Sequence, residues 1–140
     1  MPTKCVLGPL DAFLRFLTFL STCSFIPFPK PTSTLDFDIR RIFAVSASQG
    51  DVRGEHAHRQ CSQLLMCAAG KVLVTCDDGS KRSEYLLNGM HIALLIPPGI
   101  WATQEYLTND ALLVVVCDRD YESEDYIRDY SEYKKFLQLG

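Results

Sequence analysis

The chain has 140 residues, of which 47% are hydrophobic and 22% are charged, and its formal net charge is -3. These totals predict one domain of ordinary size with a real core, and they exclude a disordered or fibrous protein. The negative charge excludes a surface that attracts nucleic acid or anionic membranes as a whole, but it leaves room for a local basic site that binds a small anion.

Residues 1–34 differ from the rest of the chain, because they are apolar and aromatic and end in the Pro/Ser/Thr-rich stretch FPKPTST. Asp11 and Arg15 interrupt the apolar run, which argues against a signal peptide and against a membrane span of about 20 residues. We expect an arm that packs on the domain or on a second subunit. The six cysteines include no CxxC pair, which favours free thiols and a cytoplasmic protein.

Residues 35–140 predict a series of short strands separated by turns roughly every 8–12 residues. The strand candidates are DFDIRRIFAVSA, EHAHRQ, LLMCAAG, KVLVTC, SEYLLN, MHIALLIP, WATQEYLT and ALLVVVCD, and DDGSKR is a hairpin turn. Such a pattern favours a β-sandwich or a small β-barrel. Only the end differs: apolar or aromatic residues at positions 126, 127, 130, 133 and 137 have helical spacing and predict a C-terminal helix that packs on the barrel.

The stretch VRGEHAHRQCSQ holds two of the three histidines. On a strand, His56 and His58 project to one face, whereas Glu55 and Ala57 project to the other. Two imidazoles that face one cavity can take and give protons near neutral pH, which suits a reaction that moves a proton between neighbouring carbon atoms. Two solvated histidines on a strand would have the same spacing, so the pattern alone leaves both interpretations open.

The residues around the histidine pair resemble the two sequence motifs of the cupin superfamily. Gln63 occupies the position of the Glu in the first motif, and the stretch PPGIWA places Ala102 at the histidine position of the second. A cupin metal centre uses three histidines and one glutamate, whereas this chain offers two histidines and an amide. We therefore expect no metal ion at this site.

Four stretches together resemble one family: RGEHAHRQCSQ, DDG, IPPGIW and DRDYESEDYIRDYSEY. They are similar to the dTDP-4-keto-6-deoxyglucose 3,4-ketoisomerases, which are metal-independent cupins related to the WxcM-like proteins. The resemblance implies an all-β fold, the cupin double-stranded β-helix or jelly-roll barrel, with a short C-terminal helix. It also implies a homodimer in which the arm of residues 1–34 is exchanged between subunits, and a cupin domain of residues 35–140.

The resemblance also implies a function and a set of site residues. The enzyme would interconvert dTDP-4-keto-6-deoxyglucose and its 3-keto isomer through an enediolate without a cofactor, in deoxysugar biosynthesis for lipopolysaccharide or S-layer glycans. His56 would be the base and His58 its partner in the proton relay. Arg41 and Arg53 would bind the pyrophosphate of the dTDP-linked 4-keto-6-deoxyhexose, because a guanidinium fork suits phosphate oxygens. Trp101 would cover the sugar or stack on the base, although as a core residue it would fit the pattern equally well.

Two departures from the family pattern keep other functions open. The N-terminal Asp-x-Arg-Gly stretch of the family is replaced by DAFLRFLTFL, and Phe43 stands where the family often has a Tyr. A non-catalytic cupin that binds a sugar nucleotide, or a related nucleotide-sugar epimerase, would therefore also match the sequence. A metal-dependent cupin dioxygenase is the weakest of the alternatives.

Overall fold

The computed structural model describes residues 5–9 and 38–140, and for residues 6–9 it describes the backbone only. The described residues form ten strands, one 3-10 turn and one α-helix. In chain order these are β1 (Val6–Pro9), β2 (Arg41–Ser46), β3 (Val52–His58), β4 (Gln63–Ala69), β5 (Val72–Asp77), β6 (Arg82–Leu87), β7 (Ile92–Ile96), β8 (Trp101–Tyr106), β9 (Leu112–Cys117), η1 (Ser123–Asp125), β10 (Tyr126–Ile127) and α2 (Tyr130–Leu139). Within this part of the chain, no helix has the length and apolar character that a membrane crossing requires.

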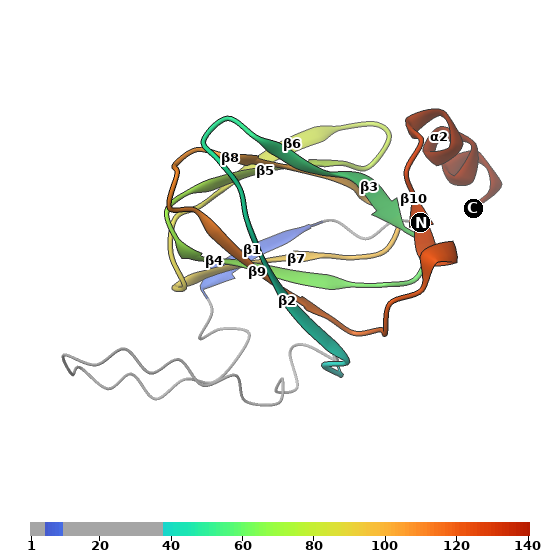
Figure 1. Ribbon diagram of the computed structural model, residues 1–140. Coiled ribbons are helices and arrows are strands. Elements are labelled where there is room, and N and C mark those ends of the chain that lie inside the picture. Colours follow the sequence, from blue (N-terminus) through green and yellow to red (C-terminus); the bar gives the residue numbers. More distant parts are fainter. Residues whose placement is uncertain (1–4, 10–37) are drawn as a thin grey trace.

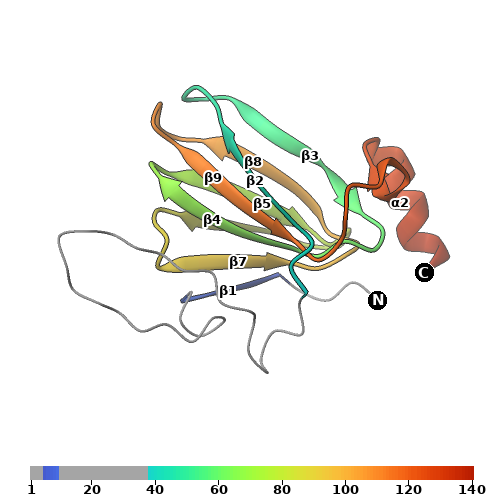
Figure 2. The same ribbon diagram turned by 60° about the horizontal axis from the view of Figure 1, so that its bottom comes forward.

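The strands form two five-stranded antiparallel sheets that face each other (Figures 1 and 2). The first sheet has the order β1-β7-β4-β9-β2, and the second has the order β10-β3-β8-β5-β6. The chain crosses repeatedly between the two sheets. Most contacts between residues therefore join segments that are distant in sequence. This arrangement confirms the predicted all-β fold with a short C-terminal helix.

The main core fills the space between the two sheets. The central strand β9 supplies apolar side chains to both faces of the first sheet, which explains why its sequence does not alternate. Its inward residues are Leu113, Val115 and Cys117, whereas Val116 packs on the outer face with Leu64 and other apolar side chains. Both faces of this sheet are therefore hydrophobic.

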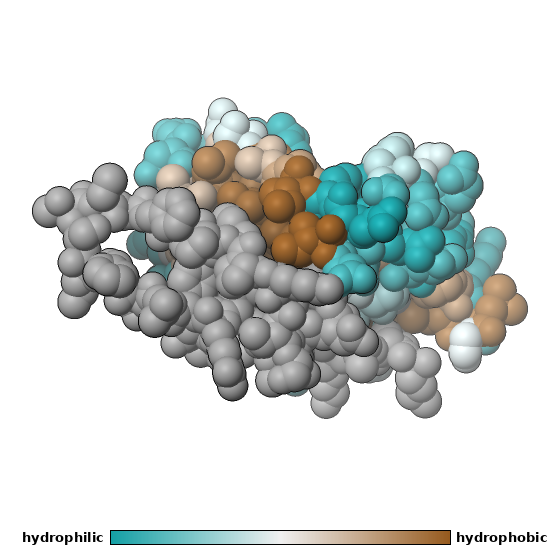
Figure 3. Space-filling view, turned by 90° about the horizontal axis from the view of Figure 1, so that it is seen from below, coloured by the Kyte–Doolittle hydropathy of each residue, from teal (hydrophilic) through white to brown (hydrophobic). Residues whose placement is uncertain are grey.

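The outer face of the first sheet carries a second apolar cluster. Leu64, Met66, Ala93 and Val116 are buried there, and Ile42 on the edge strand β2 is 53% exposed. The view from below shows an area of hydrophobic surface beside hydrophilic side chains (Figure 3). The predicted arm, residues 1–34, lies almost entirely outside the described residues, apart from β1, which pairs with β7. Its exchange between subunits therefore stays a prediction.

The helix α2 covers the end of the second sheet next to β3 and β10 (Figure 1). The helix begins at Tyr130, because the carboxylate of Asp129 accepts a hydrogen bond from the backbone N–H of Glu132 and caps its first turn. The helical spacing was predicted to extend back to position 126, but Tyr126 and Ile127 instead pair with β3. The C-terminal segment is thus a short strand followed by a helix.

Tyr133 connects α2 to the barrel through both its ring and its hydroxyl group. The side chain is fully buried, and the hydroxyl donates to the carbonyl oxygen of Asp77 at 2.7 Å and lies 3.0 Å from that of Gly99. Replacing Tyr133 with Phe keeps the ring but removes these hydrogen bonds.

We expect Tyr133→Phe to lower the free energy of unfolding by roughly 1–3 kcal/mol, because buried carbonyl groups lose their donor. Urea denaturation followed by circular dichroism measures this change. Tyr121→Phe is the matched control, since Tyr121 is 60% exposed and its change should stay within about 0.5 kcal/mol. Equal stability of the two variants would show that α2 does not depend on this hydroxyl group.

Candidate active site

A bulge in β3 determines which side chains enter the barrel. The pairing with β8 shifts between Gly54 and His56, and Gly54 and Glu55 both have positive φ angles, of 84° and 53°. A Cβ atom at Gly54 would lie only 2.8 Å from the carbonyl oxygen of Ala102, so this position requires glycine. Because of the bulge, Arg53 and His56 pair with β8 residues that share the inner face. Simple alternation would have placed them on opposite faces.

His56 is held in one tautomer by its own strand. Its Nδ1 atom lies 2.9 Å from the carbonyl oxygen of Gly54. A carbonyl oxygen only accepts, so Nδ1 carries the hydrogen and Nε2 keeps a free lone pair. Burial, together with the nearby His58 and Arg128, lowers the pKa of His56 to about 4 against the opposing effect of the Gly54 carbonyl. At neutral pH the ring is therefore an uncharged base.

His58 is oriented by a buried carboxylate. Its Nδ1 atom lies 2.8 Å from Oδ2 of Asp125, and both side chains are about 6% exposed. The same carboxylate accepts hydrogen bonds from the backbone N–H groups of Gln60 and Cys61, at 2.7 and 3.3 Å. Burial lowers the pKa of His58 even though Asp125 opposes this shift. Within the described part of the chain, Nε2 of His58 has no hydrogen-bond partner.

Tyr126 completes the cluster of rings. The ring centroids of His56 and His58 lie 5.0 Å apart, and the Tyr126 ring lies 5.0 Å from the first and 4.3 Å from the second. Tyr126 reaches this position because β10 pairs it directly with His58. Sequence reasoning assigned Tyr126 to the helix and did not predict Asp125 at all. The stretch SEDYIRDY, which carried the family resemblance, was the signal that could have identified both.

Arg41 enters the same cluster from the opposite sheet. Its guanidinium lies 3.2 Å from the hydroxyl oxygen of Tyr126 and 3.5 Å from the sulfur of Cys117. The Cys117 sulfur also interacts with Cys61, and Nε2 of Gln63 lies 3.7 Å away. The hydrogen bond from Cys61, together with those from Arg41 and Gln63, lowers the pKa of Cys117 to about 6 despite its burial. The Cys117 sulfur therefore helps to hold Arg41 in place as a hydrogen-bond acceptor.

Arg128 lies against the cluster, whereas Arg53 lies three residues before His56 on the same strand. The guanidinium of Arg128 lies 4.4 Å from the centroid of the Tyr126 ring, and its charge acts on both histidines. Arg53 is 55% exposed, and its guanidinium lies 3.4 Å from a carboxylate oxygen of Asp51. Arg41 and Arg128 therefore place positive charge beside two neutral imidazoles, which suits an anionic ligand.

Trp101, a predicted site residue, does not lie against the histidines. It follows Ile100 and precedes Ala102, both of which face the core between the sheets. Trp101 therefore points to the outer face of β8, where its ring lies 5.2 Å from that of Tyr130 and 5.6 Å from that of Tyr133. Its surroundings indicate packing under α2. The motif PPGIW gave no information about which face the ring would take.

Gln63 and Ala102, which the sequence motifs align with cupin metal ligands, are both buried in the barrel. Gln63 directs its amide to a sulfur atom, and Ala102 faces the core opposite His56 on the neighbouring strand. One other group among the described residues has metal-ligand spacing: the ligand atoms of His58, Cys61 and Asp125 lie within 4.8 Å of one another. Because the Asp125 oxygens already accept three N–H groups, this cluster serves to orient His58.

Comparison with known proteins assigns the family. Residues 15–138 match the family model described as FdtA: WxcM-like, C-terminal. The TDP-4-oxo-6-deoxy-alpha-D-glucose-3,4-oxoisomerase of Aneurinibacillus thermoaerophilus is 31% identical over 109 residues, which cover 77% of this chain and 78% of that protein. The chain belongs to the FdtA family of WxcM-like proteins, as its motifs predicted.

Solved structures show the same fold. A 3,4-ketoisomerase from Helicobacter canadensis is 29% identical, with a TM-score of 0.72 over 76% of this chain and 80% of that one. The sugar 3,4-ketoisomerase QdtA from Thermoanaerobacterium thermosaccharolyticum, in complex with TDP, is 23% identical, with a TM-score of 0.84 over 99% of this chain and 98% of that one. These likenesses confirm the predicted double-stranded β-helix of the cupins.

The site geometry predicts how His56 titrates. We expect nitrogen NMR of the labelled protein to show a neutral ring with hydrogen on Nδ1 from pH 8 down to pH 5, and protonation near pH 4, because the buried ring loses hydration when it is charged. The folded pKa lies below the ordinary value of 6.5, so the folded state binds fewer protons between these values, and folding stability falls as the pH decreases through this window. Protonation of His56 near pH 6.5 would show that the ring is solvated.

Proposed function

We propose that this protein is a sugar-nucleotide 3,4-ketoisomerase that converts dTDP-4-keto-6-deoxyglucose to its 3-keto isomer. The observation that carries the proposal is a neutral His56 with a free Nε2 lone pair, packed against an oriented His58 inside a barrel of this family. The relative from Aneurinibacillus thermoaerophilus bears the name of this activity, and a QdtA variant has been solved in complex with TDP-4-keto-6-deoxyglucose.

The two imidazoles supply the proton transfers of this reaction. His56 removes the proton from C3 of the sugar, and the electron pair of the broken C–H bond forms the C3–C4 double bond of an enediolate. A proton then returns from His56 to C4, and the hydrogen of the C3 hydroxyl passes to the C4 oxygen, so that C3 becomes the carbonyl carbon and C4 carries the hydroxyl group. His58 relays protons between the sugar and His56, with Asp125 fixing its ring, since the free Nε2 atom of His58 lies on the side away from that carboxylate.

Tyr126 and Arg41 stabilise the enediolate oxygens. The family often has a Tyr where this chain has Phe43, so one hydroxyl donor is missing from β2. The hydroxyl of Tyr126 provides a donor in the same cluster, and its hydrogen bond with the guanidinium of Arg41 favours the donation of its own hydrogen to an anion. A donor placed where negative charge develops lowers the barrier of such a step.

Arg53 and Arg128 bind the diphosphate. Arg53 shares the inner face of β3 with His56, and Arg128 follows β10 directly. Neither guanidinium has a buried ion pair among the described residues, so both can turn to phosphate oxygens at low cost. Arg41 lies deeper, and its place is beside the sugar rather than the diphosphate. Trp101 takes no part in this proposal, because its ring lies outside the barrel.

The enzyme we propose acts as a homodimer and without metal. The apolar outer face of the first sheet, with its exposed Ile42, supports a subunit contact, while β1 of the arm pairs with β7 of its own chain. The replacement of two expected cupin ligands by Gln63 and Ala102 supports proton transfer by side chains alone. Light scattering of the purified protein and metal analysis before and after chelation test these two points.

We expect His56→Asn to lower the rate of ketoisomerisation by about 10²–10⁴-fold, because the amide cannot take the C3 proton. Product formation is followed by proton NMR with dTDP-4-keto-6-deoxyglucose, and dTDP binding is followed by calorimetry. Binding should change less than threefold, since His56 does not contact the nucleotide in this account.

His91→Asn is the matched control, because His91 is an exposed histidine before β7 and outside the cluster. Its turnover should equal that of the unchanged protein. Full turnover in His56→Asn would remove His56 from the role of base, whereas dTDP binding without turnover in the unchanged protein would favour a non-catalytic sugar-nucleotide-binding protein. Inversion at C3 or C5 with the carbonyl group still at C4 would identify an epimerase.

A further inference from the structure

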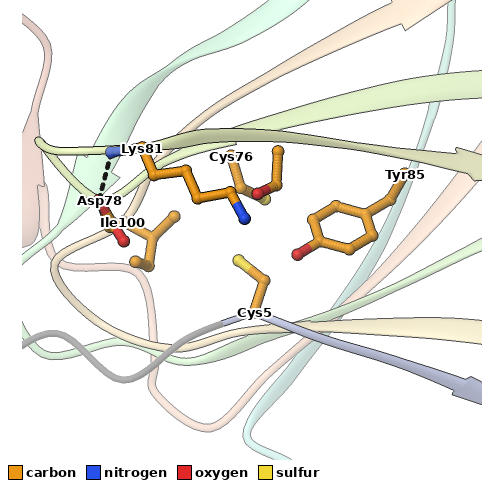
Figure 4. Close-up of a pocket in the computed structure, with 7 residues that line it drawn as sticks. Cys5, Cys76, Asp78, Lys81, Tyr85 and Ile100 are labelled. Atoms are coloured by element: carbon orange, nitrogen blue, oxygen red, sulfur yellow. Dashed lines mark hydrogen bonds between the residues drawn. The ribbon is translucent and has the colours of Figure 1, made fainter.

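A second group of nucleophilic side chains lies at the open edge between the two sheets, away from the histidines. A cavity of about 130 Å³ separates the start of β1 from the β5–β6 hairpin, and Cys5, Cys76, Lys81 and Tyr85 line it. Figure 4 shows the thiol of Cys5 and the ammonium group of Lys81 directed into the same space. Nothing in the proposed ketoisomerase reaction uses these residues.

The two cysteines come from different sheets and contact each other through their thiols. Cys5 directly precedes β1, which pairs with β7 at the edge of the first sheet, and Cys76 lies on β5 in the second sheet. Their side chains form a hydrogen bond across the gap between the sheets. Cys76 is 5% exposed, whereas Cys5 is only partly buried. A small oxidant can therefore reach Cys5 from the cavity, and Cys76 is already in position behind it.

The surroundings of the pair assign different roles to the two thiols. The hydrogen bond to Cys5 and burial raise the pKa of Cys76, so Cys76 stays protonated. Lys81 brings its cationic group into the cavity from the hairpin turn, where its backbone N–H donates to Asp78 (Figure 4). Reactive cysteines typically lie beside such a cation, because the thiolate is the form that attacks. Cys5 is thus the thiol that reacts first.

We propose that Cys5 and Cys76 form an oxidation site that a peroxide converts to a disulfide between the start of β1 and β5. The Cys5 sulfur attacks one oxygen of hydrogen peroxide, the O–O bond breaks, and a sulfenic acid and one water molecule form. The Cys76 sulfur then attacks the sulfenic sulfur, the S–O bond breaks, and a second water molecule leaves. The two thiols lose two electrons and two protons in total, and the peroxide is reduced to water. A small thiol reverses the bond by exchange.

The bond would join the start of β1, at the edge of the first sheet, to β5 in the second sheet across the gap between them. It would close a long loop of chain, and disulfides that close long loops restrict the unfolded state most. The oxidised protein should therefore have a higher midpoint of thermal unfolding than the reduced protein, by at least about 5 °C. This site is independent of the proposed ketoisomerase activity, so failure of either proposal leaves the other unaffected.

The test treats the full chain with hydrogen peroxide, blocks the remaining thiols, and digests with trypsin without reduction. We expect mass spectrometry to find peptide 5–15 linked to peptide 72–81, in protein that migrates as a single chain on a non-reducing gel. Dithiothreitol should separate the two peptides and reverse the rise in the unfolding midpoint. Cys5→Ser should abolish both the link and the rise.

Cys67→Ser is the control, because Cys67 is a buried free thiol whose hydrogen bonds run to the backbone of Ala69 and Gly70. It should retain the link. Cys76→Ser should behave like Cys5→Ser, and if it does not fold, the comparison of Cys5→Ser with Cys67→Ser decides alone. Recovery of peptides 5–15 and 72–81 unlinked after oxidation, or linked only between two chains, would overturn the proposal.

Discussion

The carboxylate of Asp125 is the contact on which the candidate site depends. It accepts from the His58 ring and from the backbone N–H groups of Gln60 and Cys61, so one buried anion fixes a strand end, the following turn and a catalytic candidate together. An unpaired carboxylate at 7% exposure would be costly, and these three donors offset that cost. The same contact brings Tyr126, the next residue, onto β3 and against both imidazoles. The strand β10 therefore extends the second sheet and also places Tyr126 in the candidate site.

The electrostatics of the site follow from burial and from arginine. Both imidazoles are kept neutral, because removal from water penalises their charged forms more than Asp125 and the Gly54 carbonyl favour them. The positive charge that a sugar nucleotide requires is supplied instead by guanidinium groups, which do not lose their protons in this environment. Cys117 adds an unexpected element, since its buried sulfur accepts a hydrogen bond from Arg41 and helps to fix that guanidinium. Proton transfer and anion binding are therefore assigned to different residue types.

The sequence predicted most of the fold and the shared face of the histidine pair, but not the place of Asp125 and Tyr126 beside it. Alternation, turn residues and the Asp-Gly hairpin located the strands of the barrel, and the histidine pair lies on one face as its spacing required. Three features of the structure could not be predicted from the sequence, for physical reasons. The bulge at Gly54 and Glu55 places Arg53 on the same face as His56. A prediction from strict alternation of side chains cannot account for the extra residue of a bulge. Tyr126 has helical spacing from Tyr130 and yet forms a strand, because a tertiary contact outweighs local periodicity. The face that Trp101 takes depends on the packing of α2, which no local pattern records.

The most direct test of this account is the steady-state kinetics of Asp125→Asn with dTDP-4-keto-6-deoxyglucose. The amide has nearly the shape of the carboxylate, but it cannot hold the His58 ring in the same tautomer and still accept from both backbone N–H groups. The account predicts that kcat falls on the order of 10²-fold or more, as it does when the partner that orients a reactive histidine is lost, while dTDP affinity stays within about threefold. A folded Asp125→Asn protein that turns over at the unchanged rate would contradict the central role of this carboxylate.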